Sequence, residues 1–296
     1  LDITFNFGDN FSCCDRRERF CIDRFILRRR KRILITSRQH SKTDRFTACI
    51  IDTDRCHQVK ANRTQGRQVD RTEACRTAVK LVRDGKADVL MKGLVSTDKY
   101  MRGILNKEAG LFPPKGVLSH VAVIELPGRD KLISISDVAV IPAPDFKQKQ
   151  KLIGYLAQTA KILGVEVPKI ACITASEQVL PTVPSSTEGA ILAKMGDRGQ
   201  LGKVIVDGPL SLDVALYKEV AEHKKVKGSA VAGDADALLF PNIESGNVFF
   251  KSVSHIGGGE LAAMVVGTNK PCVLTSRGDS ALSKKYSIAL ACLSAK

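Results

Sequence analysis

Residues 87–105 read ADVLMKGLVSTDKYMRGIL. Residues 87–91 form a short apolar run, which predicts a buried strand. Residues 92–97 follow as a polar loop, and residues 98–105 predict a helix. A buried strand, a polar loop and a helix in direct succession are typical of an α/β protein whose strands run parallel.

The same alternation extends from residue 71 to residue 296. It predicts an α/β fold with three α/β/α layers and a mostly parallel sheet. Further elements that the pattern predicts include two strands at 132–136 and 138–141, a capping box of Ser185 and Glu188, and one helix over 211–221.

The first part of the chain has a different composition. Residues 1–76 contain 15 of the 20 arginines and 6 of the 9 cysteines, and residues 1–70 contain only 2 of the 23 glycines. Periodicity is weak there, although residues 2–7 could form a short strand. Much of the formal charge of +15 therefore comes from a segment that does not look like the rest of the chain.

Four hypotheses fit this first segment. It could be a basic arm that binds nucleic acid through Arg28 to Arg32. It could hold a metal through Cys13, Cys14, Cys21, Cys49, Cys56 and His57, although no C-x-x-C pair occurs. It could be an ordinary divergent segment. The hypothesis that we favour is that residues 1–70 come from a shifted reading frame, since composition and periodicity change together.

Several classes of protein are disfavoured. No apolar run reaches the roughly 18 residues of a membrane span. A phosphate loop of the form G-x-x-x-x-G-K-[ST] and a G-x-S-x-G nucleophile motif are both absent. Residues 257–262 match G-x-G-x-x-A but follow a helical pattern, so we interpret them as a turn.

The cysteines at 172, 272 and 292 lie in apolar patterns and favour a reducing, cytoplasmic location.

Polar residues follow the predicted strands, where parallel sheets bind ligands. Two groups favour an anion: Lys92 with Gly93, and Ser276-Arg277-Gly278 between a strand and a helix N-terminus. Arginine adds a fork of donors that matches phosphate. Further candidates at strand ends are Ser96, Thr97, Asp145 and Asn242.

Six segments resemble the phosphate acetyl/butyryltransferase family. They are MKGLVST at 91–97, ISDVAVIPAPD at 135–145, KMGDRGQ at 194–200, VDGPLSLD at 206–213, GDADALLFPNIESGN at 233–247 and TSRGDS at 275–280. The resemblance extends over about residues 71–296, and the phosphate butyryltransferase branch is the more similar one.

The resemblance implies a reversible acyl transfer, in which butyryl-CoA and phosphate give butyryl phosphate and CoA. It also implies an isocitrate/isopropylmalate dehydrogenase-like fold with two domains and a cleft. We expect a first domain at 1–125 plus 267–296 and a second at 126–266. The family uses no metal and no cofactor besides CoA as substrate, and it suggests a homodimer or higher homo-oligomer in the cytoplasm.

The resemblance also suggests catalytic roles for Ser276, Arg277 and Asp279. Arg277 would bind phosphate, Ser276 would donate to the developing oxyanion, and Asp279 is the nearest carboxylate that could act as a base. The acetyl branch has an aspartate where this chain has Ser283, so the base is an open question. The other expected substrate contacts are Lys92, Gly93, Ser96, Thr97, Arg102, Asp145, Asn242 and Gly278.

Three alternatives remain at this point: a phosphate acetyltransferase, a dinucleotide-dependent dehydrogenase of similar fold, and a non-catalytic protein that binds polyanions through the basic arm. The favoured partners are acyl-CoA and phosphate, without a membrane or a nucleic acid.

Overall fold

A computed structural model describes residues 48–51, 56–57, 71–93, 95–276 and 278–295. These residues belong to two compact units, one before Val117 and after Gly267, the other from Val117 to Gly267. Unit 1 and unit 2 are described separately below. Among the described residues, no helix is both long enough and apolar enough to cross a bilayer.

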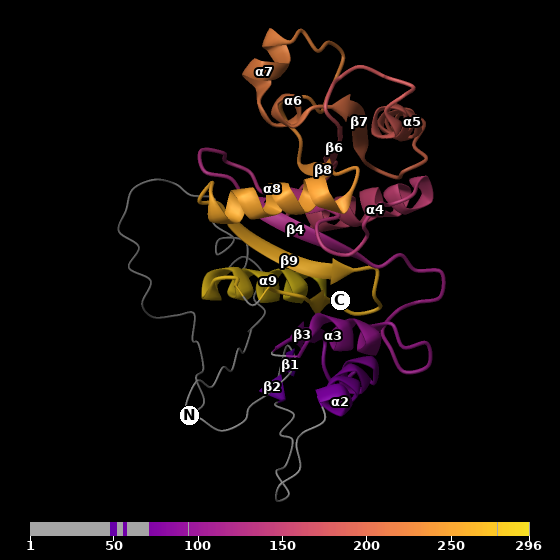
Figure 1. The fold of residues 1–296 in the computed structure, drawn as a ribbon, viewed down its shortest axis with the longest axis vertical. Helices are drawn as coiled ribbons and strands as arrows, with labels where there is room; N and C mark the ends of the chain where they lie inside the picture. The colour runs from indigo at the N-terminus through magenta and orange to yellow at the C-terminus, as the bar shows by residue number, and fades with distance from the viewer. Residues whose placement is uncertain (1–47, 52–55, 58–70, 94, 277, 296) are drawn as a thin grey trace, which may run out of the picture. The chain divides into compact units, whose positions relative to one another are not determined.

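Unit 1 contains a small sheet in the order β2-β1-β3-β10, of which Figure 1 labels β1, β2 and β3. β3 and β10 are parallel, whereas β1 is antiparallel to β2 and to β3. Its elements are β1 (Ala48–Ile51), β2 (Cys56–His57), α2 (Arg71–Arg83), β3 (Val89–Lys92), α3 (Thr97–Ile104), β10 (Cys272–Val273) and α9 (Ala281–Ser294). The core contains Val89 and Val273 from the sheet and Ile288 and Ala291 from α9.

Unit 2 contains six strands in the order β9-β4-β5-β8-β6-β7. β5, β8, β6 and β7 are parallel, and β4 is antiparallel to both of its neighbours, so only β4 runs against the rest. The elements are β4 (Ser119–Glu125), β5 (Ile133–Ser136), α4 (Phe146–Ile162), β6 (Lys169–Ile173), α5 (Pro184–Asp197), β7 (Ile205–Leu210), α6 (Leu212–Leu216), α7 (Lys218–His223), β8 (Ala237–Leu239), α8 (Ile243–His255) and β9 (Glu260–Val266).

Two apolar cores cover the opposite faces of the unit 2 sheet. Successive strand residues point to opposite faces, and in β6 Ile170 belongs to one core while Ala171 belongs to the other. The first core includes residues of α4 and α5, and the second includes residues of α6 and α8. Unit 2 is therefore an α/β/α arrangement with mostly parallel strands, as the sequence predicted.

The predicted strand at 138–141 is wrong. The N–H groups of Ala139 and Val140 donate to Asp137 Oδ1, and that of Ile141 donates to Asp137 Oδ2. Since one side chain satisfies three successive backbone donors, the chain turns after β5 and forms no further strand.

Two other local predictions are corrected. α5 begins with Pro184 after Val183, so Ser185 is not an N-cap and forms no capping box with Glu188. The helix predicted over 211–221 is two short helices, α6 and α7, separated at Tyr217. The strand expected at residues 2–7 and the basic run at 28–32 lie outside the described residues.

Candidate active site

β3 and β10 are parallel neighbours in unit 1, so both strands end at the same edge of the sheet. Their register pairs Cys272 with Leu90 and Val273 with Met91. The Tyr100 hydroxyl of α3 is buried and lies 3.1 Å from the carbonyl oxygens of both Leu90 and Val273. The helix after β3 is thereby attached to both strands, and the loops at 93–96 and 274–280 begin at one edge.

Lys92 is the last residue of β3 and is 6% exposed. Its Nζ donates to the carbonyl oxygens of Gly93 at 3.2 Å and Val95 at 3.1 Å. The ammonium group therefore binds the loop that follows its own strand. Sequence reasoning identified the position but expected the charge to face an anion directly.

The start of α3 presents several polar groups. Ser96 is the N-cap residue, and Ser96, Thr97 and Arg102 are exposed. A hydrogen bond from the Ser96 hydroxyl holds the pKa of Asp98 below its usual value, and Arg102 lowers it further through its charge. The start of α3 thus combines hydroxyl groups, backbone N–H groups without a side-chain cap and the Asp98 carboxylate, while Arg102 lies in the last turn of the helix.

A tight turn follows β10. Asp279 Oδ2 accepts a hydrogen bond from the Ser276 N–H at 2.7 Å, and the Asp279 N–H donates to the Ser276 carbonyl at 3.3 Å. The Gly278 N–H donates to Ser276 Oγ at 3.4 Å. Arg277, the predicted phosphate ligand, lies outside the described residues.

Ser283 occupies the position where the acetyl branch has an aspartate, and it belongs to the N-terminal cap of α9. Ser283 is buried, and its N–H donates to the side chain of Ser280, the N-cap of α9. The two side-chain oxygens are 3.0 Å apart. Ser283 therefore contributes to the cap of α9 and supplies no carboxylate.

Asp145 and Asn242, the two predicted contacts in unit 2, are both N-cap residues. Asp145 caps α4 through a capping box with Gln148, with both hydrogen bonds at 2.8 Å. Asn242 caps α8, and its side-chain oxygen accepts from the Ser245 N–H at 2.9 Å. These caps explain why the two residue types follow strands, and the proposed substrate contacts stay predictions.

Sequence reasoning missed a buried polar cluster around Asp137. Besides the three turn donors, Asp137 Oδ2 accepts from Ser119 Oγ at 2.8 Å and from the His120 N–H at 3.3 Å. Asp137 is 1% exposed. A lone aspartate inside the apolar run ISDVAVI was the signal, because a buried carboxylate requires several donors.

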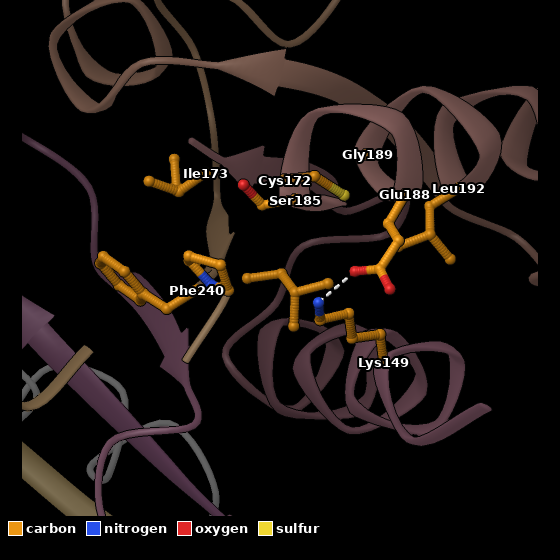
Figure 2. A pocket seen from close by; sticks show the side chains of 10 residues that line it. Lys149, Cys172, Ile173, Ser185, Glu188, Gly189, Leu192 and Phe240 are labelled. Carbon is orange, nitrogen blue, oxygen red and sulfur yellow. Dashed lines mark hydrogen bonds and ion pairs between the residues drawn. The ribbon is translucent and has the colours of Figure 1, made fainter. Parts of the chain in front are cut away.

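A recess of about 210 Å³, open to solvent, lies in unit 2 beside α4 and α5. Figure 2 shows Lys149 of α4 reaching toward Glu188 of α5, and the two form an ion pair. Cys172 and Ser185 also line the recess. The Lys149 side chain is 9% exposed, and Glu188 pairs with it instead of capping its own helix.

Residues 257–259 join α8 to β9, with Gly258 at a φ of 67°. They follow a helix and precede a strand, the reverse of a dinucleotide motif, so the interpretation as a turn is confirmed. Among the described residues, no group of three or more His, Cys, Asp or Glu side chains could hold a metal ion. Of the N-terminal cysteines, Cys13, Cys14 and Cys21 lie outside the described residues, and Cys49 and Cys56 are described only as residues of β1 and β2.

Residues 27–292 match a protein family described as phosphate acetyl/butaryl transferase. The match begins upstream of residue 71, where the motif resemblance starts. The hypothesis of a shifted reading frame falls mostly on residues outside the described ones and stays a hypothesis.

Curated relatives agree with the family match. The chain is 47% identical over 221 residues to phosphate butyryltransferase of Clostridium acetobutylicum, covering 75% of this chain and 73% of the relative. It is 40% identical over 218 residues to phosphate acetyltransferase of Thermotoga maritima, covering 74% of each protein.

Two solved structures are similar to the computed one. A branched-chain phosphotransacylase from Enterococcus faecalis aligns with a TM-score of 0.71 at 35% identity, over 76% of this chain and 80% of that chain. A phosphotransacetylase from Streptococcus pyogenes aligns with a TM-score of 0.64 at 25% identity, over 75% and 67% of the two chains.

Proposed function

The chain belongs to the phosphate acetyl/butaryl transferase family, and we propose on that basis that it transfers acyl groups reversibly between CoA and inorganic phosphate. Acyl-CoA and phosphate give acyl phosphate and CoA. The observation that carries this proposal is the 47% identity to a phosphate butyryltransferase over most of both chains.

The reaction makes clear demands on the site. A phosphate oxygen attacks the thioester carbonyl, the carbonyl oxygen gains negative charge, and the C–S bond then breaks as CoA leaves. Fixed cationic and hydrogen-bonding groups near that oxygen lower the barrier most. We assign this work to the Ser276 hydroxyl and the Arg277 guanidinium.

The edge at β3 and β10 supports binding of the phosphate. Gly93, Ser96 and Thr97 bring backbone and hydroxyl donors to the loop after β3, and Gly278 follows β10. Arg102 adds a positive charge on α3. In this proposal the buried ammonium group of Lys92 fixes the loop through its hydrogen bonds to the carbonyl oxygens of Gly93 and Val95. It also contributes a positive charge next to the proposed phosphate site.

Other parts of the assignment stay predictions. They are the isocitrate/isopropylmalate dehydrogenase-like fold with its cleft, the domain boundaries, the homodimer, the cytoplasmic location, the substrate contacts of Asp145 and Asn242, and a reaction without metal or additional cofactor. Butyryl-CoA is the proposed acyl donor, and the branched-chain name of one structural relative makes isobutyryl-CoA a second candidate.

Release of CoA from butyryl-CoA tests the proposed function. We expect release that depends on phosphate and saturates with it, because phosphate is the acyl acceptor. The assay follows free thiol with acetyl-, butyryl- and isobutyryl-CoA as donors, and identifies the acyl phosphate by mass. Folded protein that releases no CoA with any donor in the presence of phosphate would contradict the proposal.

Two buried thiols, those of Cys172 and Cys272, should not interfere with that assay. Burial raises the pKa of Cys172 to about 12, with a further rise from Asp207, and burial raises the pKa of Cys272 to about 12. At pH 8 only about one in 10⁴ of these thiols is ionised, so neither should react while the protein is folded. Peptide mapping after labelling checks this, with urea-unfolded protein as the positive control. Rapid labelling of Cys172 in folded protein would contradict the burial of this thiol, which is 5% exposed although it lines the recess.

Two alternatives make different predictions. A dehydrogenase would bind NAD, which calorimetric titration measures directly. A polyanion-binding protein would bind DNA with a steep dependence on salt that disappears when residues 1–70 are deleted. Phosphate-dependent release of CoA without either effect would leave the acyltransferase as the surviving proposal.

A further inference from the structure

Four hydrogen bonds hold the turn that contains Asp279. The carboxylate accepts the Ser276 N–H, while the Asp279 N–H returns to the Ser276 carbonyl. Lys284 Nζ donates to the Asp279 carbonyl at 2.9 Å, and the Gly278 N–H donates to Ser276 Oγ. The Asp279 side chain is thus directed at the backbone of the residue that precedes Arg277 in the sequence.

This geometry has a consequence for the Ser276 hydroxyl. Because Ser276 Oγ accepts a hydrogen bond from Gly278, its own proton is available to a different acceptor. Ser276 is exposed at this edge of unit 1, so a substrate oxygen can be that acceptor. The bond from Asp279 fixes the backbone from which this hydroxyl projects.

The chemistry does not require a carboxylate base. In the direction of acyl-CoA synthesis, the CoA thiol loses its proton, sulfur attacks the acyl carbon, and the C–O bond to phosphate breaks. The departing phosphate becomes more basic as that bond breaks, so it can take the thiol proton and leave as hydrogen phosphate. Atoms and charge balance with the two substrates alone.

We propose, on the basis of the proposed function, that Asp279 is a positioning residue and not the base. Its carboxylate fixes the Ser276 backbone and so presets the turn that presents the Ser276 hydroxyl. This role needs a hydrogen-bond acceptor at that place and does not need a group that exchanges protons.

Asp279→Asn and Asp279→Ala separate the two roles. Asparagine keeps a side-chain oxygen that can accept the Ser276 N–H, so we expect kcat within about fivefold of the wild type and an unchanged pH profile, whereas loss of a general base typically lowers the rate by about 10²–10⁴-fold. Alanine removes the acceptor, and we expect kcat to fall by about 10- to 100-fold with little change in KM for butyryl-CoA.

Amide hydrogen exchange gives a readout that does not depend on catalysis. The Ser276 N–H should exchange slowly in the wild type and in Asp279→Asn, and fast in Asp279→Ala. Asp130→Asn, an exposed change between β4 and β5 and outside the six family segments, is the matched control and should alter neither exchange at Ser276 nor activity.

Either of two results would overturn the proposal. One is an Asp279→Asn enzyme that loses more than about 100-fold in kcat together with the acidic limb of its pH profile, which is the behaviour of a base. The other is an Asp279→Ala enzyme with wild-type kcat and slow exchange at Ser276. A wild-type protein without phosphate-dependent activity would refute the proposed function instead, and the exchange data would still decide whether Asp279 holds the turn.

Discussion

Replacing Arg277 with alanine is expected to lower kcat/KM for butyryl-CoA and phosphate by about 100- to 1,000-fold, or about 2.7–4 kcal/mol. The side chain follows β10 in the sequence, just before the helix that Ser280 caps. A guanidinium at this place can bind two phosphate oxygens at once, and it can stabilise the charge that develops on the acyl oxygen. Most of the loss should therefore appear in kcat.

Arg277→Lys distinguishes charge from geometry. Lysine keeps the positive charge but lacks the planar fork of donors, so we expect it to restore only a small part of the lost rate. Arg76→Ala in α2 is the matched control, since it removes an exposed arginine outside the six family segments. A loss below tenfold for Arg277→Ala would refute the central role of this residue.

The sequence predicted the edge of β3 and β10 because apolar runs and their polar ends are local signals. Residues 87–91 predicted a buried strand, and β3 occupies Val89–Lys92. The six motifs in order then predicted the family, and the family match and the relatives confirm it. The parallel pairing of β3 with β10 joins residues far apart in the chain, and only the strand-end rule suggested it.

The features that sequence reasoning missed depend on which donor and acceptor groups meet in the folded chain, and one of them joins two helices that are far apart in sequence. Glu188 looked like half of a capping box because it lies three residues after Ser185, but Lys149 of another helix binds it. Lys92 was expected to face an anion directly, whereas its ammonium group is buried and donates to the carbonyl oxygens of Gly93 and Val95. A local pattern records which groups are present, and packing decides which of them meet.

Asp137 is the clearest case in which the local pattern misled, because this residue changes the course of the chain after β5. Residues 138–141 are apolar and β-branched enough to predict a strand. The carboxylate offers their N–H groups a closer acceptor than a neighbouring strand could, and so the chain turns. α8 packs directly on this turn, since a Cβ added at Gly246 would lie 2.3 Å from the Asp137 carbonyl oxygen.

Asp137→Asn is therefore expected to destabilise the protein by about 3 kcal/mol or more, because each buried donor that loses its acceptor costs about 1–3 kcal/mol. The carboxylate accepts five hydrogen bonds, three at Oδ2 and two at Oδ1. The substitution turns one of these oxygens into an amide nitrogen, which places N–H groups against the N–H donors of the turn. Urea unfolding, followed by circular dichroism, measures the loss as a lower midpoint at an unchanged slope.

Ser119→Ala provides the graded comparison for Asp137→Asn. It removes one donor to the carboxylate, together with the hydrogen bond between the Ser119 and Ser136 hydroxyls, and leaves the four backbone N–H groups in place, so we expect a loss of only about 1–2 kcal/mol. If Asp137→Asn unfolds at the wild-type urea concentration, the carboxylate does not hold the turn. If both variants lose the same amount, the Ser119 bond alone accounts for the effect. The expected order, a small loss for the serine and a large one for the aspartate, arises only when the backbone donors of residues 139–141 depend on both carboxylate oxygens.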